Sequence, residues 1–269
     1  IPDHASVSAT VEVARKRLGE SKASFVNALL RSVTRKSHEE WFTPLDAITD
    51  NVERLSIQYS HPEWIVSAYF DLLKDYARVE EELAANNVPA TPTLVSWPGS
   101  STQDELVSEG AVATKYSPYG ARFEGAPGSL DLIRHRKAGV QDEGSQLVAL
   151  AFSQATKSAK TVLDLCAGPG GKAALISHIC DVEGREFVAN EVSEARAKLV
   201  KNVVGRFPVW VGDAREISSH GQNFDAIIAD VPCTGLGALR RRPEVRWRRT
   251  VQDLRALTEL QLELANSAI

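Results

Sequence analysis

The chain has 269 residues, 43% of them hydrophobic and 25% charged, with a formal net charge of −4 at neutral pH. This balance is typical of a globular protein of about two domains and excludes a disordered or fibrous chain. No apolar run approaches the ~18 residues that cross a bilayer, and no signal-peptide pattern opens the chain, so we expect a cytoplasmic protein with no membrane partner.

The cysteine and methionine contents carry two further indications. The three cysteines form no C-x-x-C pair and are odd in number, so neither a zinc site nor a disulfide framework is indicated. We therefore expect a reduced compartment and no metal. The chain begins at Ile1 without an initiator and contains no methionine, so we expect either that its ends are cut or that methionine positions are missing from it.

Residues 4–33 show the apolar spacing of two consecutive helices. The first is predicted over residues 4–18, and the second follows Gly19, with Ser21 as its N-cap and an apolar stripe over residues 25–33. This pattern predicts a helical hairpin at the end of an all-α domain. The exposed face of this hairpin carries the basic residues Lys16, Arg17, Lys22, Arg31, Arg35 and Lys36. Two interpretations are open: these residues contact RNA, or, as is commoner for a basic helix surface, they are only solvated.

A third helix is predicted from Trp64 to Leu83, because Pro62 and Glu63 form a helix start signal. The stretch that follows, residues 86–128, is rich in Pro, Gly, Ser and Thr and contains short strand-like pieces at 93–95 and 111–113. We predict a small α+β connector here rather than a disordered linker, since four aromatic residues give it a core. They are Trp97, Tyr116, Tyr119 and Phe123.

Beyond residue 139 the pattern alternates between strands and helices. The first predicted strand begins at Thr161, and three more span residues 186–191, 209–213 and 224–231. The predicted helices span residues 141–150, 194–207 and 251–269. Regular β-α-β alternation favours a parallel sheet with helices on its faces. We therefore expect three domains: a helical part at 1–59, an α+β connector at 60–138, and an α/β domain at 139–269 that stops short of a complete doubly wound sheet.

The segment from Val162 to Lys172 is an apolar run, a Gly/Pro turn and the start of an amphipathic helix. In such an arrangement backbone N–H groups and a helix dipole meet the polar end of a ligand. The loop Ala167-Gly168-Pro169-Gly170-Gly171 is neither G-x-G-x-x-G nor a Walker loop, which disfavours dinucleotides and nucleoside triphosphates. For the loop alone, an ordinary strand-to-helix turn is the alternative.

Four carboxylates follow four successive predicted strands: Asp164, Glu191, Asp213 and Asp230. At the end of the second strand, where Glu191 lies, Rossmann-like folds bind ribose hydroxyls, because a carboxylate matches a vicinal diol. An adenosine-type ligand with an amino-acid tail fits this set together with the loop. The sequence therefore predicts a site for the methyl donor S-adenosylmethionine.

Cys233 follows Asp230-Val231-Pro232 at the end of the last predicted strand and precedes an arginine-rich run, a setting that favours the thiolate. A buried, inert cysteine is the alternative. Carbon-5 of a pyrimidine is not nucleophilic until a thiolate adds at carbon-6, so a cysteine beside a methyl-donor site points to methylation of a base carbon. The base must leave its stack to reach such a site. By these residues alone, Cys233 is the candidate nucleophile.

The arginine-rich run carries six arginines within residues 240–249. Residues 1–150 hold 15 Lys and Arg against 21 Asp and Glu, whereas residues 151–269 hold 16 against 14. This local excess indicates a polyanionic partner, with Trp247 as a stacking surface, although a merely solvated surface is the alternative. The residues predicted to bind RNA are Arg240, Arg241, Arg242, Arg246 and Trp247.

Several motifs together resemble the RNA 5-methylcytosine methyltransferase family, and within it the bacterial Fmu/Sun, or RsmB-like, group. The motifs are DLCAGPGGK at 164–172, DVPCTG at 230–235, RRPEVRW at 241–247, VQDEGS at 140–145 and FVNALLR at 25–31. This resemblance implies a Rossmann-like S-adenosylmethionine-dependent methyltransferase domain, here truncated at its C-terminus. The α+β connector and the end of an all-α NusB-like domain would precede it.

The resemblance also implies roles for single residues. The donor would be held by Cys166, Ala167, Gly168, Pro169, Gly170, Gly171, Lys172, Glu191, Asp213 and Asp230, with Asp230 also near the cytosine edge. Cys233 would assist release of the product, while the nucleophile belongs to a Thr-Cys-Ser motif that this sequence lacks and that we expect beyond Ile269. The family usually has alanine where Gly168 stands, a change that we expect to keep the turn.

The implied activity is methylation of carbon-5 of a cytosine in 16S ribosomal RNA through a covalent cysteine adduct, by a protein that we expect to be a monomer. Two alternatives stay open. The same chemistry could act on another RNA, such as tRNA, or the chain could be a non-catalytic RNA-binding assembly factor that has kept the fold.

Overall fold

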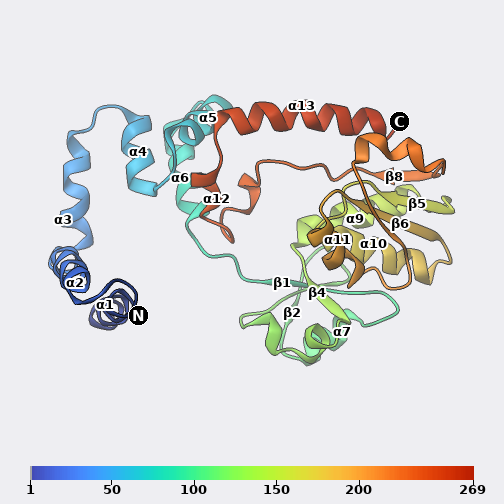
Figure 1. The fold of residues 1–269 in the computed structure, drawn as a ribbon, viewed down its shortest axis with the longest axis horizontal. Coiled ribbons are helices and arrows are strands. Elements are labelled where there is room, and N and C mark those ends of the chain that lie inside the picture. The colour runs from blue at the N-terminus through green and yellow to red at the C-terminus, as the bar shows by residue number, and fades with distance from the viewer. Residues whose placement is uncertain (1) are drawn as a thin grey trace. The chain divides into compact units, whose positions relative to one another are not determined.

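The computed structural model describes residues 2–269 and divides the chain into two compact units, residues 1–87 and 88–269 (Figure 1). The first unit is helical throughout its described part. Its elements are α1 (Asp3–Leu18), α2 (Glu20–Thr34), α3 (His38–Phe42), the 3-10 helix η1 (Thr43–Ala47), α4 (Asn51–Tyr59), α5 (Glu63–Leu73) and α6 (Tyr76–Asn86). The prediction of an all-α N-terminal part is therefore confirmed.

Helices α1 and α2 pack on each other as predicted, around the buried residues Val11, Ala14 and Ala23. The predicted cap is wrong: the N-cap of α2 is Gly19, and no side chain caps the helix. Gly19 has a φ of 86°, a conformation open to glycine, so the chain turns there and Ser21 falls inside the first turn.

The single helix predicted from Trp64 to Leu83 is also wrong, because the structure has the two helices α5 and α6. Between them Lys74 adopts a left-handed conformation with a φ of 54°, and the Asp75 side chain caps α6 by accepting a hydrogen bond from the backbone N–H of Ala77 at 2.9 Å. Both helices share one core with α4, made by Leu55, Val66, Val79 and Leu83. Residues 63–86 thus belong with the helical unit rather than with the connector predicted at 60–138.

The second unit begins with a four-stranded antiparallel sheet in the order β2-β3-β1-β4. Its strands are β1 (Thr93–Ser96), β2 (Val112–Ala113), β3 (Gly120–Arg122) and β4 (Ala138–Val140), with α7 (Gln103–Ser108), the 3-10 helix η2 (Pro127–Ser129) and α8 (Asp131–Arg134) between them. Leu94, Leu106 and Ala121 are fully buried in its core. The predicted α+β connector and both of its strand-like pieces are present, although β4 runs past the predicted boundary at 138.

A parallel sheet in the order β7-β6-β5-β8 follows, as the β-α-β alternation predicted. Its strands are β5 (Thr161–Asp164), β6 (Glu186–Glu191), β7 (Val209–Val211) and β8 (Ala226–Ile228). The helices of this region are α9 (Glu143–Ala155), α10 (Gly171–Val182), α11 (Glu194–Lys201), the 3-10 helices η3 (Ala214–His220) and η4 (Leu236–Ala238), α12 (Val245–Arg248) and α13 (Val251–Ser267).

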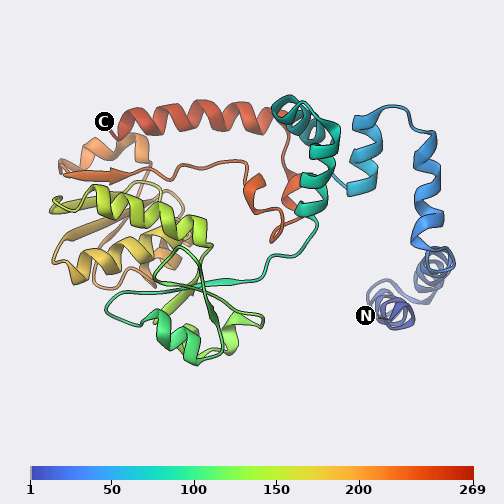
Figure 2. The same ribbon diagram turned by 180° about the vertical axis from the view of Figure 1, so that it is seen from behind.

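Two apolar clusters cover the two faces of the parallel sheet. Figure 2 shows the helices that flank this sheet. Successive residues of a strand point to opposite faces, so Val162 packs in the cluster of α9, α10 and α11, and Leu163 in the cluster of η3 and α13. Helix α11 ends at Lys201, earlier than the predicted 207, with Asn202 as its C-cap, and Gly205 beyond it has a φ of 62°. All four strands end at one edge of the sheet, and the loops at that edge form the candidate site. No helix in residues 2–269 is long and apolar enough to cross a membrane.

Candidate active site

A cavity of about 350 Å³ lies at the carboxyl edge of the parallel sheet; we call it the donor cavity. Six of the predicted site residues line it: Cys166, Gly168, Glu191, Asp213, Asp230 and Cys233. Its apolar lining comes mainly from Leu165, Val192, Ala214, Val231, Leu260 and Leu264. The other predicted loop residues, Ala167, Pro169, Gly170, Gly171 and Lys172, do not line it, so the structure brings only part of the predicted donor set to one surface.

The loop between β5 and α10 is held in place by its backbone. The N–H of Ala167 donates to the carbonyl of Asn190 at 2.9 Å, and the N–H of Gly170 donates to the carbonyl of Ala167 at 2.8 Å. Gly170 has a φ of 113°, which favours glycine, and α10 begins at the next residue. The predicted order of strand, Gly/Pro turn and helix is therefore present.

Gly168 approaches the carboxylate of Glu191 closely. Its N–H donates to Oε2 of Glu191 at 3.0 Å, and a Cβ added at Gly168 would lie 2.1 Å from that oxygen. The turn forms with Gly168 in place of the family's usual alanine, and an alanine here would require the carboxylate of Glu191 to move.

Glu191 is 3% exposed, and its carboxylate is fully engaged. Besides the N–H of Gly168, it accepts a hydrogen bond from the N–H of Ser193 at 2.8 Å and pairs with Arg196 at 2.7 Å. Arg196 lies in the first turn of α11 and lines the donor cavity. A ligand hydroxyl that binds Glu191 would join or replace these partners.

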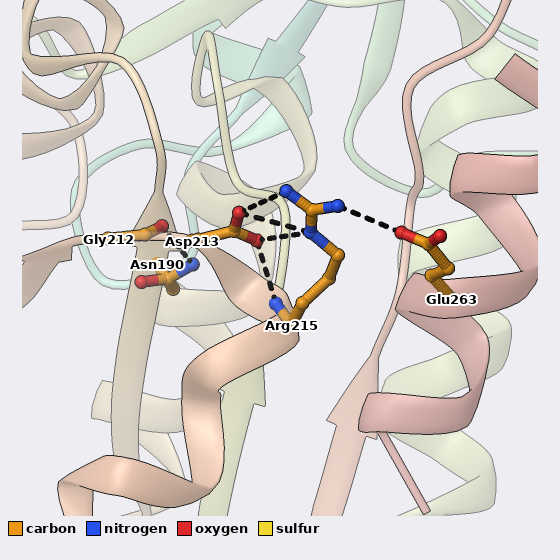
Figure 3. Close-up of polar contacts among 5 residues, drawn as sticks. All are labelled: Asn190, Gly212, Asp213, Arg215 and Glu263. Atoms are coloured by element: carbon orange, nitrogen blue, oxygen red, sulfur yellow. Dashed lines mark hydrogen bonds and ion pairs between the residues drawn. The ribbon is translucent and has the colours of Figure 1, made fainter. Parts of the chain in front are cut away.

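Asp213 is paired with Arg215, two residues further along η3 (Figure 3). The Asp213 carboxylate accepts hydrogen bonds from the backbone N–H and the guanidinium of Arg215 at 2.6–3.0 Å, and the same guanidinium reaches Glu263 of α13 at 2.9 Å. The Arg215 side chain beside Asp213 holds the pKa of that carboxyl below its ordinary value. Asp213 thus faces the donor cavity as a carboxylate bound to a cation.

The third carboxylate of the cavity, Asp230, pairs with Lys172 from the first turn of α10. Nζ of Lys172 lies 2.7 Å from Oδ2 of Asp230, and the lysine side chain is 18% exposed whereas that of Asp230 is 53% exposed. The loop predicted to hold the donor and the strand end predicted to meet the base are joined by this ion pair. Lys172 contributes through Asp230 rather than by lining the donor cavity itself.

Asp164, the acid at the end of β5, does not line the donor cavity. It is 1% exposed, and burial raises its pKa to about 7, with the nearby carboxylates of Asp230 and Glu191 acting in the same direction. Asp164 therefore retains a proton up to about neutral pH.

The three cysteines differ in environment. Cys166 and Cys180 are at least half-buried, and burial raises the pKa of Cys166 to about 12 and that of Cys180 to about 11, so both remain thiols at neutral pH. Cys233 is exposed and lines the donor cavity beside Pro232. Among these three, only Cys233 combines solvent exposure with a place in the cavity.

The residues of the donor cavity fit S-adenosylmethionine. Asn190 is 1% exposed and lines the cavity; its Nδ2 donates to the carbonyls of Leu165 and Gly212, but its Oδ1 has no hydrogen-bond partner in the described part of the chain. That oxygen and three carboxylates offer acceptors for the hydroxyl and amino groups of the donor, and negative charge near its sulfonium. The apolar lining suits the flat face of adenine.

Our sequence reasoning missed Asn190, Arg196 and Arg215 as parts of the site. Asn190 directly precedes Glu191 at the end of an apolar strand, which is the one signal that could have indicated it. The two arginines carry no such signal, because their pairing with the carboxylates depends on how α11 and η3 start.

The arginine run is mostly held by contacts within the unit. Arg240 donates to the backbone carbonyl of Val88 at 3.0 Å, Arg241 pairs with Asp142, and Arg249 donates to the carbonyl of Thr234 at 3.2 Å. Arg246 is 2% exposed, so it does not present its charge to RNA as predicted. The exposed side chains of the run include those of Arg242, Trp247 and Arg248.

No cluster of three or more His, Cys, Asp or Glu side chains that could hold a metal ion occurs within residues 2–269. The expectation that no metal takes part remains a prediction.

Comparison with known proteins gives two family matches. Residues 151–269 match the family described as 16S rRNA methyltransferase RsmB/F, and residues 1–35 match the NusB family. Among solved structures, PH0851 aligns with a TM-score of 0.78 at 20% identity over 96% of this chain and 59% of that chain. NSun6 from Pyrococcus horikoshii with SFG aligns with a TM-score of 0.61 at 16% identity, over 77% of this chain and 79% of that chain. These two show a shared fold.

Curated relatives match nearly the whole chain. Rv1407 of Mycobacterium tuberculosis is 40% identical over 99% of this chain and 60% of its own length. A Bacillus subtilis protein named probable ribosomal RNA small subunit methyltransferase B is 32% identical over 98% of this chain and 60% of its own length. The Vibrio vulnificus ribosomal RNA small subunit methyltransferase B is 30% identical over 98% of this chain and 62% of its own length. The chain thus spans about three fifths of the length of these relatives. These matches support a methyltransferase domain of the RsmB/F type at residues 151–269.

Proposed function

We propose that the protein containing this chain methylates carbon-5 of a cytosine in 16S ribosomal RNA, with S-adenosylmethionine as the methyl donor. The observation that carries the proposal is the donor cavity, where Glu191 and Asp213 share one surface with Asp230 and the exposed thiol of Cys233. The names of the Bacillus and Vibrio relatives support ribosomal RNA as the substrate class.

In this proposal Asn190, Glu191 and Asp213 hold the donor through its hydroxyl and amino groups, and the loop at Cys166–Gly168 lies against it. When bound, S-adenosylmethionine supplies an electrophilic methyl group. The buried carboxylate of Glu191 is held by two backbone N–H groups and Arg196, so its acceptor atoms are in place before the donor arrives. This preorganisation lowers the entropic penalty of binding.

Asp230 is proposed to orient the base. A carboxylate accepts a hydrogen bond from the exocyclic amino group of cytosine, which uracil lacks, and Lys172 holds Asp230 in position through the 2.7 Å ion pair. Asp230 would therefore contribute to the choice of cytosine over uracil.

The reaction needs a thiolate that adds to carbon-6, which makes carbon-5 nucleophilic. After carbon-5 gains the methyl group, a base removes the carbon-5 proton, the sulfur–carbon-6 bond breaks, and the thiolate leaves. The family resemblance assigns the addition to a Thr-Cys-Ser cysteine beyond Ile269 and the release step to Cys233. Cys233 is exposed and adjoins the donor cavity, a position open to a base bound there.

The test uses the full-length protein with Cys233→Ala, incubated with methyl donor and unmodified small-subunit RNA and run on a denaturing gel. If Cys233 acts in release, methyl transfer proceeds and a covalent protein–RNA adduct accumulates. Cys180→Ala is the matched control: it also removes a thiol, but from within α10, outside the lining of the donor cavity, and should give no adduct.

Other outcomes would overturn parts of the proposal. Loss of both adduct and methylation with RNA binding intact would make Cys233 the attacking thiol. Methylation of tRNA but not of 16S RNA by the wild-type protein would contradict the ribosomal substrate. Donor and RNA binding without methylation of any RNA would favour a non-catalytic assembly factor.

A further inference from the structure

The loop between β5 and α10, residues 165–170, is here called the donor loop. A second cavity, of about 410 Å³, lies on its other side; we call it the connector cavity. Strands β1 and β4 supply part of its wall, including Trp97 at the end of β1, and α10 and α11 supply another part. Pro169, Gly170 and Gly171 line it, whereas the preceding residue Gly168 lines the donor cavity. One short loop therefore separates the two cavities.

Two buried polar side chains line the connector cavity with an atom that lacks a partner. Trp97 is 5% exposed and Gln141 is 6% exposed; Nε1 of Trp97 and Oε1 of Gln141 have no hydrogen-bond partner in residues 2–269. A buried polar group that stays unpaired lowers the stability of the folded state. Together they offer one donor, Nε1 of Trp97, and one acceptor, Oε1 of Gln141. The edge of an unpaired nucleobase carries an acceptor and a donor that could pair with them.

The surroundings hold both side chains in place. The indole of Trp97 packs against His178 with ring centroids 5.0 Å apart, and a Cβ at Gly139 would lie 2.9 Å from its Cζ2, so the ring fits only because residue 139 is glycine. The amide of Gln141 donates through Nε2 to Oγ of Ser145 at 3.2 Å, which turns Oε1 away from that hydroxyl. The polar atoms are thus fixed before any ligand binds.

The charge of the connector cavity differs from that of the donor cavity. Among the residues that the structure describes, Arg136 is the one charged residue that lines it, and no carboxylate does. Arg136 is exposed and has a left-handed φ of 54°. Its Nη1 donates a hydrogen bond to Oδ1 of Asn202 at 3.4 Å. A cationic rim with a neutral, partly apolar interior matches a nucleotide, whose phosphate would meet Arg136 and whose base would enter.

We propose that the connector cavity binds one unpaired nucleotide of the RNA substrate that flanks the methylated cytosine. Its base accepts a hydrogen bond from Nε1 of Trp97 and donates one to Oε1 of Gln141, and its phosphate pairs with Arg136. This inference rests on the proposed function for the presence of RNA. It gives the antiparallel sheet a role in substrate selection and places the donor loop between the flanking base and the methyl donor.

The experiment observes Trp97 directly. Full-length protein labelled with ¹⁵N in its tryptophan indoles is saturated with S-adenosylhomocysteine, so that the donor cavity is filled, and titrated with each of the four nucleoside 5′-monophosphates. The indole resonance of Trp97, identified by its absence in Trp97→Phe, should shift saturably with at least one of them. If none of the four moves it, the proposal is overturned.

Two matched variants test the rim. Arg136→Gln should weaken that binding by about three- to tenfold, as expected for loss of one phosphate contact. Arg134→Gln removes the same charge at a position two residues before Arg136. Arg134 pairs with Asp131 and does not line the cavity, so this variant should leave the binding unchanged. Equal effects of the two variants would contradict the assigned phosphate position.

Failure of this inference can be told from failure of the proposed function by measuring methyl transfer on 16S RNA in parallel. Methyl transfer that is normal in Arg136→Gln at limiting RNA, together with an unmoved Trp97 resonance, would reject the connector cavity and leave the methyltransferase proposal standing. A saturable Trp97 shift without methylation of any RNA would support nucleotide binding in the connector cavity and reject the methyltransferase proposal.

Discussion

At the residue scale, the carboxylates of the donor cavity and the acid behind it behave differently. Each of the three cavity acids has a cationic partner at 2.6–2.7 Å; the pairs are Glu191 with Arg196, Asp213 with Arg215, and Asp230 with Lys172. Asp164 is buried beside two of these acids, and its raised pKa means that the fold favours its neutral form. The site thus combines three ion-paired acceptors with one buried acid whose raised pKa favours its neutral form.

The buried acid predicts a pH dependence of stability. The pKa of Asp164 is about 7 in the folded protein and ~3.9 in an unfolded chain, so between these values the unfolded state releases a proton that the folded state keeps. The free energy of unfolding should therefore fall as pH rises through this window, by up to ~1.4 kcal/mol per unit, and level off above about pH 7. Asp164→Asn should flatten this dependence in urea unfolding curves. An unchanged slope would contradict the raised pKa.

The close approach of Gly168 to Glu191 predicts a second effect. In Gly168→Ala the carboxylate must leave the N–H of residue 168, and the loss of one charge-assisted hydrogen bond in a buried site should lower the free energy of unfolding by ~1–3 kcal/mol. Gly171→Ala is the matched control, since a Cβ there meets nothing within 4 Å. Urea unfolding that shows equal stability for both variants would mean that Glu191 moves freely.

At the element scale, α13 covers the face of the parallel sheet opposite α9, α10 and α11. Its Leu264 is 4% exposed and packs with Leu163 and Leu165 of the sheet and with Ile217 of η3. The same helix carries Glu263, which reaches Arg215 and so connects α13 to the Asp213 side of the donor cavity. Packing and charge on one helix therefore support the same wall of the site.

This arrangement predicts unequal effects of two leucines in α13. Leu264→Ala removes a buried side chain and leaves a cavity, so it should lower the free energy of unfolding by ~2–4 kcal/mol and weaken binding of the methyl donor. Leu262→Ala, at a side chain that is 64% exposed, should change stability by less than ~0.5 kcal/mol. Chemical denaturation and calorimetric donor titration measure both. Similar losses for the two variants would argue against α13 as part of the site.

At the scale of the whole molecule, the chain is acidic but carries its cationic run in the unit that holds the donor cavity. Contacts with distant parts of that unit hold Arg240, Arg241 and Arg249, and Arg246 is buried. Arg242 and Arg248 are exposed, and Arg242 pairs with the nearby Glu244 at 3.5 Å. If the run binds RNA, these two arginines are the ones positioned to meet phosphates.

This division predicts which charges govern RNA affinity. In the full-length protein, the double variant with Arg242→Glu and Arg248→Glu should weaken RNA binding and reduce the slope of log affinity against log salt by about one or more, as expected for loss of two phosphate contacts. Arg255→Glu changes an exposed arginine of α13 outside the run and should leave the slope nearly unchanged. Filter binding at several salt concentrations measures the slope. An equal change for Arg255→Glu would indicate only a general effect of net charge.

The sequence by itself determined the features that depend on neighbouring residues. The run from Glu186 to Glu191 forms β6 over the predicted residues, because an apolar β-branched and aromatic core bounded by acids is a local signal. The strand, Gly/Pro turn and helix around Gly170 were likewise readable, as was the placement of Asp213 and Asp230 at strand ends. These are properties of periodicity and turn chemistry.

Only the tertiary structure decided which distant groups meet. The pairing of Lys172 with Asp230, the contact of Gly168 with Glu191 and the burial of Arg246 depend on how β5, β6 and β8 align and on where the helices pack against them. The connector cavity needs Trp97 and Gln141 beside the donor loop, although about 30 residues or more separate them in sequence. Local sequence signals cannot specify such contacts, because packing of the whole unit sets the distance between side chains far apart along the chain.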